Sequence, residues 1–583
     1  MNLREILHHA DVCVVGGGLA GMCAAISAAR RGAKVVLMQD RPVLGGNASS
    51  EIRMWVGGAR GMRETGLIEE INIENMWRNP ERNYSIRDSI LYEKVRFEPN
   101  IDLLLNCSCN GLAMASDSRI ASVRGWQLTT YTWHTVTADY FIDCSGDSIL
   151  APLSGAAFTV GRESSAQYGE DIAPETADKK TMGLSCLMQM RQYDRKIEFK
   201  PPFWAEKITK EQLENRGSAD PSVPLENWWW MELGGTRDTI HDTEEIRDDL
   251  QKLTWGVVDY VKNSGEVKAD DWGVDWVGML PGKRESRRYI GDHVLTQNDV
   301  RSEGRFEDIV AYGGWPMDDH HPDGFRHKGP PTVYHPAPSL YGIPYRCIYS
   351  VNIDNLLFAG RNISATHAAM SSSRVMATCA VLGQAVGTAA ALCVKYAVTP
   401  RGIYLAHLGE LKEQLLEDDA TLPFNRRKPS PLTLEAAISP ESAEILRNGI
   451  DRELPDSENK WVGKLGESIT FSFESTRAVH GIRMVFDSDL RRETIGDRDG
   501  RRKMGMNCNL ERGDTSTKFP DTMVKSYRVE VWEDGEWKTV AKVTDNHQRL
   551  VVDRFVAVAS AVRFTPLKTH GCPEARIFAV DIL

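Results

Sequence analysis

Three glycines near the start of the chain are spaced for binding phosphate groups. They are Gly16, Gly18 and Gly21, in the pattern Gly-x-Gly-x-x-Gly. The first glycine permits a tight turn, the second lets the backbone approach a pyrophosphate, and the third lets a helix pack closely on a strand. The first turn of that helix offers backbone N–H groups to the phosphates. We therefore predict that a dinucleotide binds here, with Leu19 and Ala20 in the same turn.

The segments around these glycines favour dinucleotide binding over an ordinary glycine turn. Residues 12–15 predict a buried parallel strand, residues 22–31 an Ala-rich helix, and residues 33–38 a second strand. In such folds an acid at the end of the second strand usually binds the adenosine ribose. Gln39 stands at that position and Asp40 follows it. The carboxylate is therefore one residue later than expected, which argues against NAD as the dinucleotide.

A second glycine-rich loop follows the second strand. Two adjacent glycines precede small polar residues, and a loop rich in exposed backbone N–H groups forms a cradle for anions. In this region the predicted cofactor contacts are Arg41, Gly45, Gly46, Asn47, Ala48 and Ser49.

This order of motifs resembles flavoproteins with two dinucleotide-binding domains, over residues 10–400. The resemblance implies that the cofactor is FAD. It also implies that FAD contacts a turn after a third apolar strand, another glycine turn near residue 360, and the start of a long apolar helix capped by a run of serines. These segments contribute Ser145, Gly146, Gly360, Arg361, Ser373, Val375 and Met376.

Residues 281–288 and 312–321 resemble motifs of an FAD-dependent oxidoreductase family that is often found with carbohydrate-degrading genes. A more distant similarity is to the fumarate reductase flavoproteins. The implied fold is α/β, a FAD/NAD(P)-binding Rossmann-like domain with an inserted α+β substrate or cap domain. From residue 432 onward, short alternating strands predict an all-β sandwich that resembles galactose-binding-like modules. The expected parts are the FAD-binding domain (1–155 and 346–400), the cap (156–345), a helix and linker (401–431) and the sandwich (432–583).

Composition restricts the expected partners. The net charge of −11 argues against nucleic acid. Residues 375–394 carry the spacing Gly383-x-x-x-Gly387, known from membrane helix pairs, but their Ala, Gly and Thr content favours a buried helix and no membrane span. The 11 cysteines lack a CxxC pair and the first strand begins too early for a signal peptide, so we expect a cytoplasmic protein. We expect no metal ion, and a homo-oligomer is left open.

Two histidines are candidates for proton transfer, because imidazole is neutral near pH 7 and oxidation of an alcohol needs a base. His320 and His321 follow a Gly-Gly-Trp turn and two acids that can orient an imidazole. The family motif implies the first of the pair, His320, as the base; a solvated polar loop or a metal site is the alternative. His367, before the long helix, is expected to contact substrate or cofactor.

A dense cationic group stands at Arg284, Arg287 and Arg288. On a helix, Arg284 and Arg288 would share one face and bind a phosphate, a carboxylate or a sugar acid. A solvated helix face is the alternative. Arg288 is the predicted catalytic member of this group.

Three hypotheses of function follow. The leading one is an FAD-dependent oxidoreductase that oxidises a CH–OH group of a carbohydrate or glycoside by hydride transfer to flavin N5, with a histidine base and an electron acceptor that the sequence does not name. The alternative is a fumarate-reductase-like enzyme that reduces an activated C=C bond of an unsaturated carboxylate, with an arginine as proton donor. The third is a flavin-bearing scaffold whose sandwich binds glycan.

Overall fold

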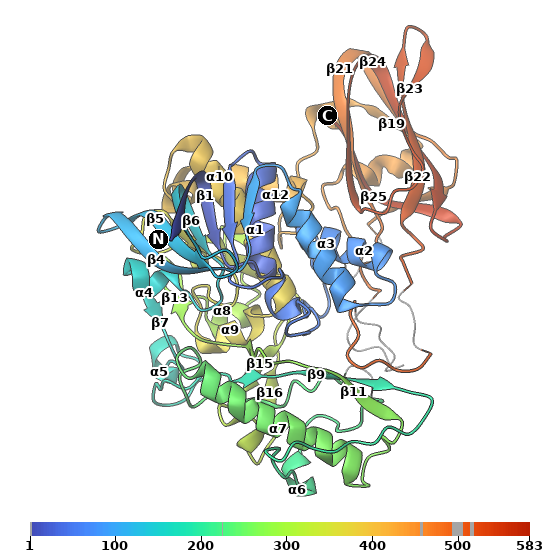
Figure 1. Cartoon of the computed structure of the whole chain (residues 1–583). Coiled ribbons are helices and arrows are strands. Elements are labelled where there is room, and N and C mark those ends of the chain that lie inside the picture. Colours follow the sequence, from blue (N-terminus) through green and yellow to red (C-terminus); the bar gives the residue numbers. More distant parts are fainter. Residues whose placement is uncertain (1–2, 224–225, 455–456, 458, 493–504, 514–517) are drawn as a thin grey trace. The chain divides into compact units, whose positions relative to one another are not determined.

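The chain folds into two compact units. The computed structural model describes residues 3–223, 226–454, 457, 459–492, 505–513 and 518–583 (Figure 1). The first unit contains Met1–Glu64, Glu81–Lys412 and Ile495–Thr515, and the second contains Thr65–Pro80, Glu413–Thr494 and Ser516–Leu583. Residues 65–80, from the N-terminal part of the sequence, therefore belong to the second unit, and residues 495–515, from the C-terminal part, belong to the first. The finer division made from the sequence stays a prediction.

The first unit is built on a sheet with the strand order β3-β2-β1-β6-β5-β4, in which β18 also pairs with β6. The strands are β1 (Arg4–Val15), β2 (Val35–Met38), β3 (Ile101–Leu104), β4 (Cys107–Ser116), β5 (Arg119–Gln127), β6 (Thr132–Asp143) and β18 (Leu356–Phe358). All pairs among β1, β2, β3, β6 and β18 are parallel. Their carboxyl ends therefore share one edge of the sheet, where nucleotides bind in such folds. The predicted α/β, Rossmann-like fold is confirmed.

Two helices pack against each other with almost no side chain between them. They are α1 (Leu19–Arg30) and α10 (Met376–Tyr396). A Cβ atom at Gly383 would lie 2.1 Å from the carbonyl oxygen of Ala20, and one at Gly387 would lie 2.2 Å from that of Ala24. Among the described residues, α10 alone is long and apolar enough to cross a membrane, yet 94% of its apolar window is buried inside the protein. The glycine spacing thus serves packing within the core.

The chain between β6 and β18 contains the inserted cap, whose longest helix is α7 (Thr243–Asn263). In Figure 1 this helix lies beside β9 (Met188–Gln192) and β11 (Trp272–Val277). Apolar side chains of α7 pack in one core cluster with Trp228, Trp230 and Trp272, so these tryptophans are structural. Asn509, from the C-terminal part of the sequence, accepts hydrogen bonds from the Met190 backbone (2.9 Å) and from the Trp228 indole (3.3 Å).

The remaining elements of the first unit are short. The helices are α3 (Tyr84–Arg96), α4 (Leu150–Ser154), α5 (Ser165–Tyr168), α6 (Lys210–Leu213), α8 (Gln297–Arg301), α9 (His367–Ser373) and α11 (Pro400–Gly402), and α12 (Leu408–Glu417) continues into the second unit. The strands are β7 (Phe158–Thr159), β8 (Leu184–Ser185), β10 (Glu232–Leu233), β12 (Gly282–Lys283), β13 (Arg288–Tyr289), β14 (Ile309–Gly313), β15 (Met317–His320), β16 (Thr332–His335) and β17 (Tyr341–Pro344).

The second unit is an all-antiparallel β domain with the order β20-β25-β21-β24-β22-β23, and β19 pairs with β21. Its strands are β19 (Ala437–Ser439), β20 (Trp461–Lys464), β21 (Ile469–Phe486), β22 (Val524–Glu533), β23 (Glu536–Val543), β24 (Leu550–Thr569) and β25 (Glu574–Ile582). Strand β21 is long rather than short, and its pairing with β24 contains register shifts. The helices are α2 (Leu67–Arg78) and α13 (Pro431–Glu435). Ile73 of α2 is buried in the core of this domain.

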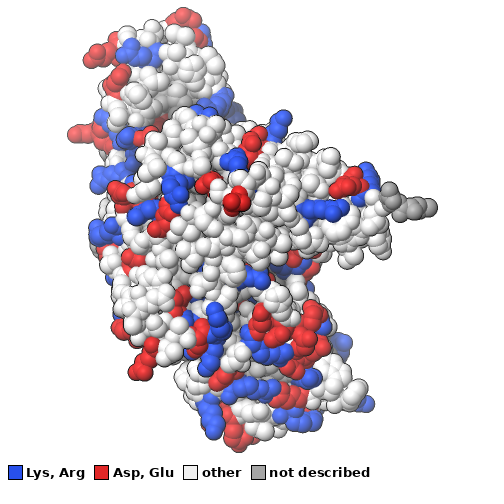
Figure 2. Space-filling view, turned by 90° about the vertical axis from the view of Figure 1, so that its left-hand side faces the viewer, with Lys and Arg blue, Asp and Glu red and all other residues white. Residues whose placement is uncertain are grey.

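Charged side chains of both signs are interspersed on the face that Figure 2 shows, with broad uncharged areas between them. The acidic side chains on this face are therefore not gathered into one patch.

Replacing Gly387 by alanine is expected to destabilise the protein by about 1–3 kcal/mol, because the new methyl group overlaps the Ala24 carbonyl. Gly409 lies in α12, and a Cβ atom there would meet no atom within 4 Å. Gly409→Ala is the matched control and is expected to stabilise by about 0.5–1 kcal/mol through helix propensity. Urea unfolding measures both changes; equal stability of Gly387→Ala and the parent would contradict this packing.

Candidate functional site

A cavity of about 380 Å³ lies in the first unit, at the carboxyl edge of the parallel sheet. Most of the predicted cofactor contacts line it: Gly16, Gly18, Leu19, Ala20, Gln39, Asp40, Arg41, Gly45, Gly46, Asn47, Ser145, Gly146, Gly360, Arg361, Val375 and Met376. Four others, Gly21, Ala48, Ser49 and Ser373, are not part of its lining.

The two glycine loops form a cradle whose shape depends on missing side chains. Gly16 has a φ of +100°, and a Cβ atom there would lie 2.4 Å from the Cys144 carbonyl oxygen. A Cβ atom at Gly21 would lie 1.8 Å from the Gly16 carbonyl oxygen. Gly18 and Gly46 approach each other, and a Cβ atom at Gly46 would lie 3.2 Å from the Gly18 Cα. Helix α1 begins at this point without a capping side chain or an acid in its first turn, so its N–H groups are suited to an anion.

Gln39 and Asp40 follow the second strand, where one acid usually binds the adenosine ribose, and the two side chains differ in their surroundings. The buried Gln39 amide accepts a hydrogen bond from the Gly17 N–H (2.7 Å) and donates one to the Val43 carbonyl (3.0 Å). It therefore holds the glycine loop in place. The Asp40 side chain is 59% exposed and lies 3.5 Å from Arg41 Nε, which leaves Asp40 the better placed of the two for a ribose hydroxyl.

The second helix N-terminus at the cavity belongs to α10. The sequence predicted that serines 371–373 cap this helix, but they end a separate helix, α9, and the capping position is Val375, which makes no side-chain hydrogen bond. Ser372 donates to the Trp315 carbonyl instead. The interruption lets the first turn of α10 open into the cavity.

Asp147 is a third anchor of the cavity wall. Its carboxylate accepts hydrogen bonds from Lys283 Nζ (2.7 Å), an Arg361 terminal nitrogen (2.7 Å) and Ser286 Oγ (2.8 Å). Burial opposes ionisation, but the two cations outweigh it and lower the pKa of Asp147. The contacts join the first part of the nucleotide domain to the cap and to the Gly360 turn.

A glycine cradle, two uncapped helix N-termini and a cationic wall are what a dinucleotide requires. A model of the family described as FAD dependent oxidoreductase matches residues 11–415. The chain belongs to this family. It is an oxidoreductase, and its cofactor is FAD.

Two curated relatives match short parts of the chain. A glycerol-3-phosphate dehydrogenase of Mycobacterium leprae is 42% identical over 62 residues, which is 10% of this chain and 11% of the relative. A fumarate reductase (cytochrome) of Shewanella frigidimarina is 63% identical over 38 residues, 6% of this chain and 7% of the relative. The chain thus covers about a tenth of these curated relatives. A family 32 carbohydrate-binding module of Streptococcus pneumoniae EndoD, known as a structure, is 17% identical with a TM-score of 0.19, over 26% of this chain and 99% of that one.

FAD fits the residues that line the cavity. The Gly18–Gly46 cradle leaves the space that a pyrophosphate needs, because a side chain at Gly46 would fill it. The buried Arg361 Nε makes no hydrogen bond with the described residues and could donate one to the cofactor. When bound, FAD supplies hydride acceptance and donation. The protein supplies the binding, the orientation and the charges around it.

A chain of five charged side chains that alternate in sign borders the other end of the cavity; three are buried and the two arginines at its ends are partly exposed. His320 lies at its centre, with Nδ1 2.6 Å from Glu232 and Nε2 3.3 Å from Asp318. Glu232 in turn lies 3.4 Å from Arg284, and Asp318 lies 3.3 Å from Arg374. Arg284, Asp318 and Arg374 line the cavity, whereas His320 and Glu232 lie behind them. We call Trp55, Trp315, Arg284, Asp318 and Arg374 together the arginine end.

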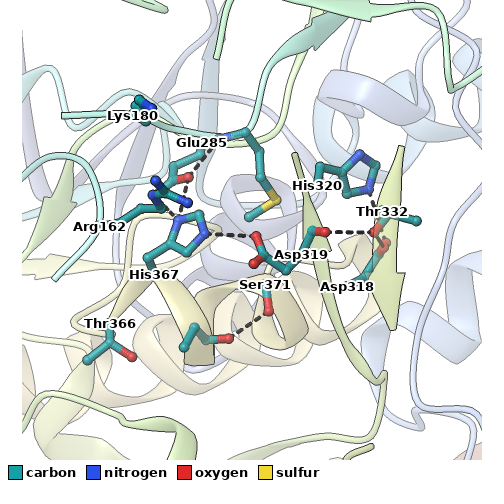
Figure 3. A network of polar contacts seen from close by, with 12 residues as sticks. Arg162, Lys180, Glu285, Asp318, Asp319, His320, Thr332, Thr366, His367 and Ser371 are labelled. Atoms are coloured by element: carbon teal, nitrogen blue, oxygen red, sulfur yellow. Dashed lines mark hydrogen bonds and ion pairs between the residues drawn. The ribbon is translucent and has the colours of Figure 1, made fainter. Parts of the chain in front are cut away.

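A second alternating chain lies beside the first and is buried away from the cavity. His367 lies between Glu285 (2.9 Å from Nδ1) and Asp319 (3.0 Å from Nε2), as Figure 3 shows. Glu285 also contacts Arg288, whose guanidinium donates to Glu163 at 2.6 Å. Burial opposes the charge on His367, but the Glu285 and Asp319 carboxylates outweigh it and raise its pKa to about 10.

The predicted role of histidine as a neutral base does not fit this geometry. Neither His320 nor His367 lines the cavity, and both ring nitrogens of each contact carboxylates. Burial alone would lower the pKa of His320, but Glu232 and Asp318 outweigh it and raise the pKa. Each imidazole is therefore held as a cation that joins two carboxylates.

The expected helical face of arginines is also wrong. Residues around Arg284 and Arg288 are extended, because β12 pairs with β8 and β13 pairs with β7. The two side chains consequently diverge. Arg284 reaches the cavity, while the buried Arg288 binds Glu285, Glu163 and two backbone carbonyls.

Several residues of the arginine end and of the two alternating charge chains were not singled out from the sequence. Arg374 had a usable signal, since a cation directly before a long helix opposes the helix dipole and calls for a compensating acid; that acid is Asp318. Glu232, Glu285 and Trp55 carry no comparable local signal, because their partners are distant in the sequence.

One group of potential metal ligands occurs among the described residues. His321, Asp323 and His327 place ligand atoms within 4.8 Å of one another. None of the three lines the cavity, and the expectation of no metal ion stays a prediction.

Gly18→Val is expected to fold and to lose FAD. The backbone at Gly18 (φ −64°, ψ 176°) suits any residue, and a Cβ atom there meets only Gly46 Cα, at 3.9 Å. The added side chain occupies the cradle, so flavin content should fall roughly tenfold or more. Absorbance at the flavin bands measures content and circular dichroism measures folding, with Gly409→Ala as the control. Full flavin occupancy in Gly18→Val would contradict the assignment of the cradle.

The charge on His367 is expected to make stability depend on alkaline pH. A folded-state pKa raised above the ordinary histidine value of 6.5 gives stability that is complete below 6.5 and is lost as pH rises through about 10. The unfolding free energy should therefore fall more steeply from pH 7 to alkaline pH in the parent than in His367→Gln. His9→Gln, at an exposed histidine, is the control and should match the parent. Parallel curves for parent and His367→Gln would show that the imidazole is neutral.

Proposed function

We propose that this FAD-dependent oxidoreductase oxidises a CH–OH group of a carbohydrate-like substrate. The observation that carries the proposal is the pair of tryptophans at the arginine end. Trp55 and Trp315 lie edge to face with ring centroids 6.3 Å apart, and both line the cavity. Each has a buried indole N–H that makes no hydrogen bond with the described residues. The indole rings can pack against the C–H face of a sugar, and their N–H groups can donate to its oxygen atoms.

The hydroxyl proton needs a route that does not use a neutral histidine. Asp318 lines the cavity, and its carboxylate is positioned to accept a hydrogen bond from the reacting hydroxyl. Burial opposes its charge, but His320 and Arg374 outweigh it and hold the pKa of Asp318 well below its usual range. Asp318 therefore orients the hydroxyl without retaining the proton. Arg284 and Arg374 would stabilise the developing alkoxide and the proton would leave to water, while the carbinol hydrogen would be accepted as hydride by bound FAD.

The same cations support a second candidate, reduction of an activated C=C bond in an unsaturated carboxylate. Arg284 and Arg374, rather than the buried Arg288, would then hold the carboxylate and supply the proton. The two candidates differ in which redox state of the flavin reacts.

Anaerobic stopped-flow mixing separates the two candidates. A panel of sugars and glycosides is expected to bleach the oxidised flavin, whereas unsaturated dicarboxylates mixed with the reduced enzyme are expected to leave it reduced. Asp318→Asn should slow bleaching about 10- to 100-fold, since it replaces the charged acceptor for the hydroxyl by a neutral amide and leaves Arg374 without its carboxylate partner. Asp171→Asn is the control, because Asp171 is an acid outside the cavity. No bleaching by any sugar, with reoxidation by an unsaturated carboxylate, would favour reduction.

A further inference from the structure

The charges that line the FAD cavity are not balanced by FAD alone. Six cationic side chains line it, against three acids. The cations are Arg41, Lys283, Arg284, Arg287, Arg361 and Arg374, and the acids are Asp40, Asp147 and Asp318. The FAD pyrophosphate supplies about two negative charges. Outside the lining, Glu51 lies 3.6 Å from Arg41 and balances it. At the arginine end, the cations Arg284, His320 and Arg374 face only two acids, Glu232 and Asp318. One positive charge is therefore in excess there, in a wall that is largely removed from water, where an uncompensated charge is unfavourable.

The arginine end holds hydrogen-bond donors that no described residue uses. One terminal nitrogen of Arg374 donates to the backbone carbonyl and the carboxylate of Asp318, at 3.2 and 3.3 Å. The buried Nε of Arg374 and the indole N–H of Trp315 make no hydrogen bond with the described residues. Arg284 is different, because its terminal nitrogens donate to Ser185 Oγ (2.9 Å) and the Trp229 carbonyl (2.8 Å). Of the two cations at the arginine end, Arg374 is therefore the one with an unpartnered buried donor.

His320 fixes both arginines in this arrangement. It binds the two carboxylates that contact them, so the guanidiniums of Arg284 and Arg374 are held at the same end of the cavity. The first turn of α10, which follows Arg374 directly, adds a helix N-terminus without a capping side chain or an acid.

We propose that the arginine end binds an anionic oxygen group of the substrate, a carboxylate or a phosphate ester carried by the sugar, with Arg374 as the specificity-determining residue. This inference rests on the proposed function and names its substrate class. The group accepts hydrogen bonds from Arg374 Nε and the Trp315 indole, and its charge balances the cavity wall. The hydroxyl oxygens of a neutral sugar can accept both hydrogen bonds, but a neutral sugar leaves the excess positive charge uncompensated.

The test measures binding to the oxidised holoenzyme, in which the flavin carries no ring charge. Methyl glucoside, methyl glucuronide and glucose 6-phosphate are titrated anaerobically, and Kd is taken from the change in the flavin spectrum. The anionic sugars are expected to bind about 10- to 100-fold more tightly than the neutral one. The tighter of the two anionic sugars identifies a carboxylate or a phosphate. Arg374→Gln should abolish the preference, and Arg374→Lys, which keeps the charge but lacks Nε, should retain part of it.

Arg301→Gln is the matched control, because Arg301 pairs with Asp171 outside the cavity. It should keep the parent's preference. Equal Kd values for neutral and anionic sugars in the parent, or an unchanged preference in Arg374→Gln, would overturn the inference. Arg374-dependent binding of an anionic sugar without any bleaching would support the inference and overturn the proposed oxidation. Bleaching by all three sugars with equal Kd would support the oxidation and overturn the inference.

Discussion

The close packing of α1 against both the sheet and α10 is the constraint on which the site depends. At Gly21 a single Cβ atom would overlap the Gly16 carbonyl, and at Gly383 and Gly387 it would overlap the α1 backbone. Backbone therefore rests on backbone on both sides of α1. The first residue before each helix, Gly18 and Val375, lines the same cavity. The glycine contacts thus place the positive N-terminal ends of α1 and α10 at one cavity.

The cap completes the cavity by a different physical principle. Its side of the site is built from charges that alternate in sign and are held by one another. Such a chain is stable when buried only if each member keeps its partners, because a lone buried ion is strongly unfavourable. The arrangement also fixes directions, since Glu232 and Asp318 each contact one ring nitrogen of His320 and one arginine. Rigidity on the cap side and close packing on the helix side give a preorganised wall.

The two histidines illustrate how surroundings decide chemistry. An imidazole in water is poised to exchange protons near neutral pH. Between two buried carboxylates it becomes a fixed cation, and the pKa of His367 rises to about 10. Its function then is to neutralise and orient acids. The charged groups that line the cavity at its arginine end are instead Asp318 and the two arginines near it, Arg284 and Arg374.

The sequence by itself determined the parts of the site that depend on local backbone geometry. The spacing of Gly16, Gly18 and Gly21 and the strand and helix beside them specify a phosphate loop, because turn sterics and helix N-termini act over a few residues. Only the tertiary structure decided the charges at the arginine end. Glu232 is 88 residues from His320, and Glu285 is 82 residues from His367. Burial and Coulomb interactions depend on distances in space, so the protonation of these groups follows from the fold that brings them together.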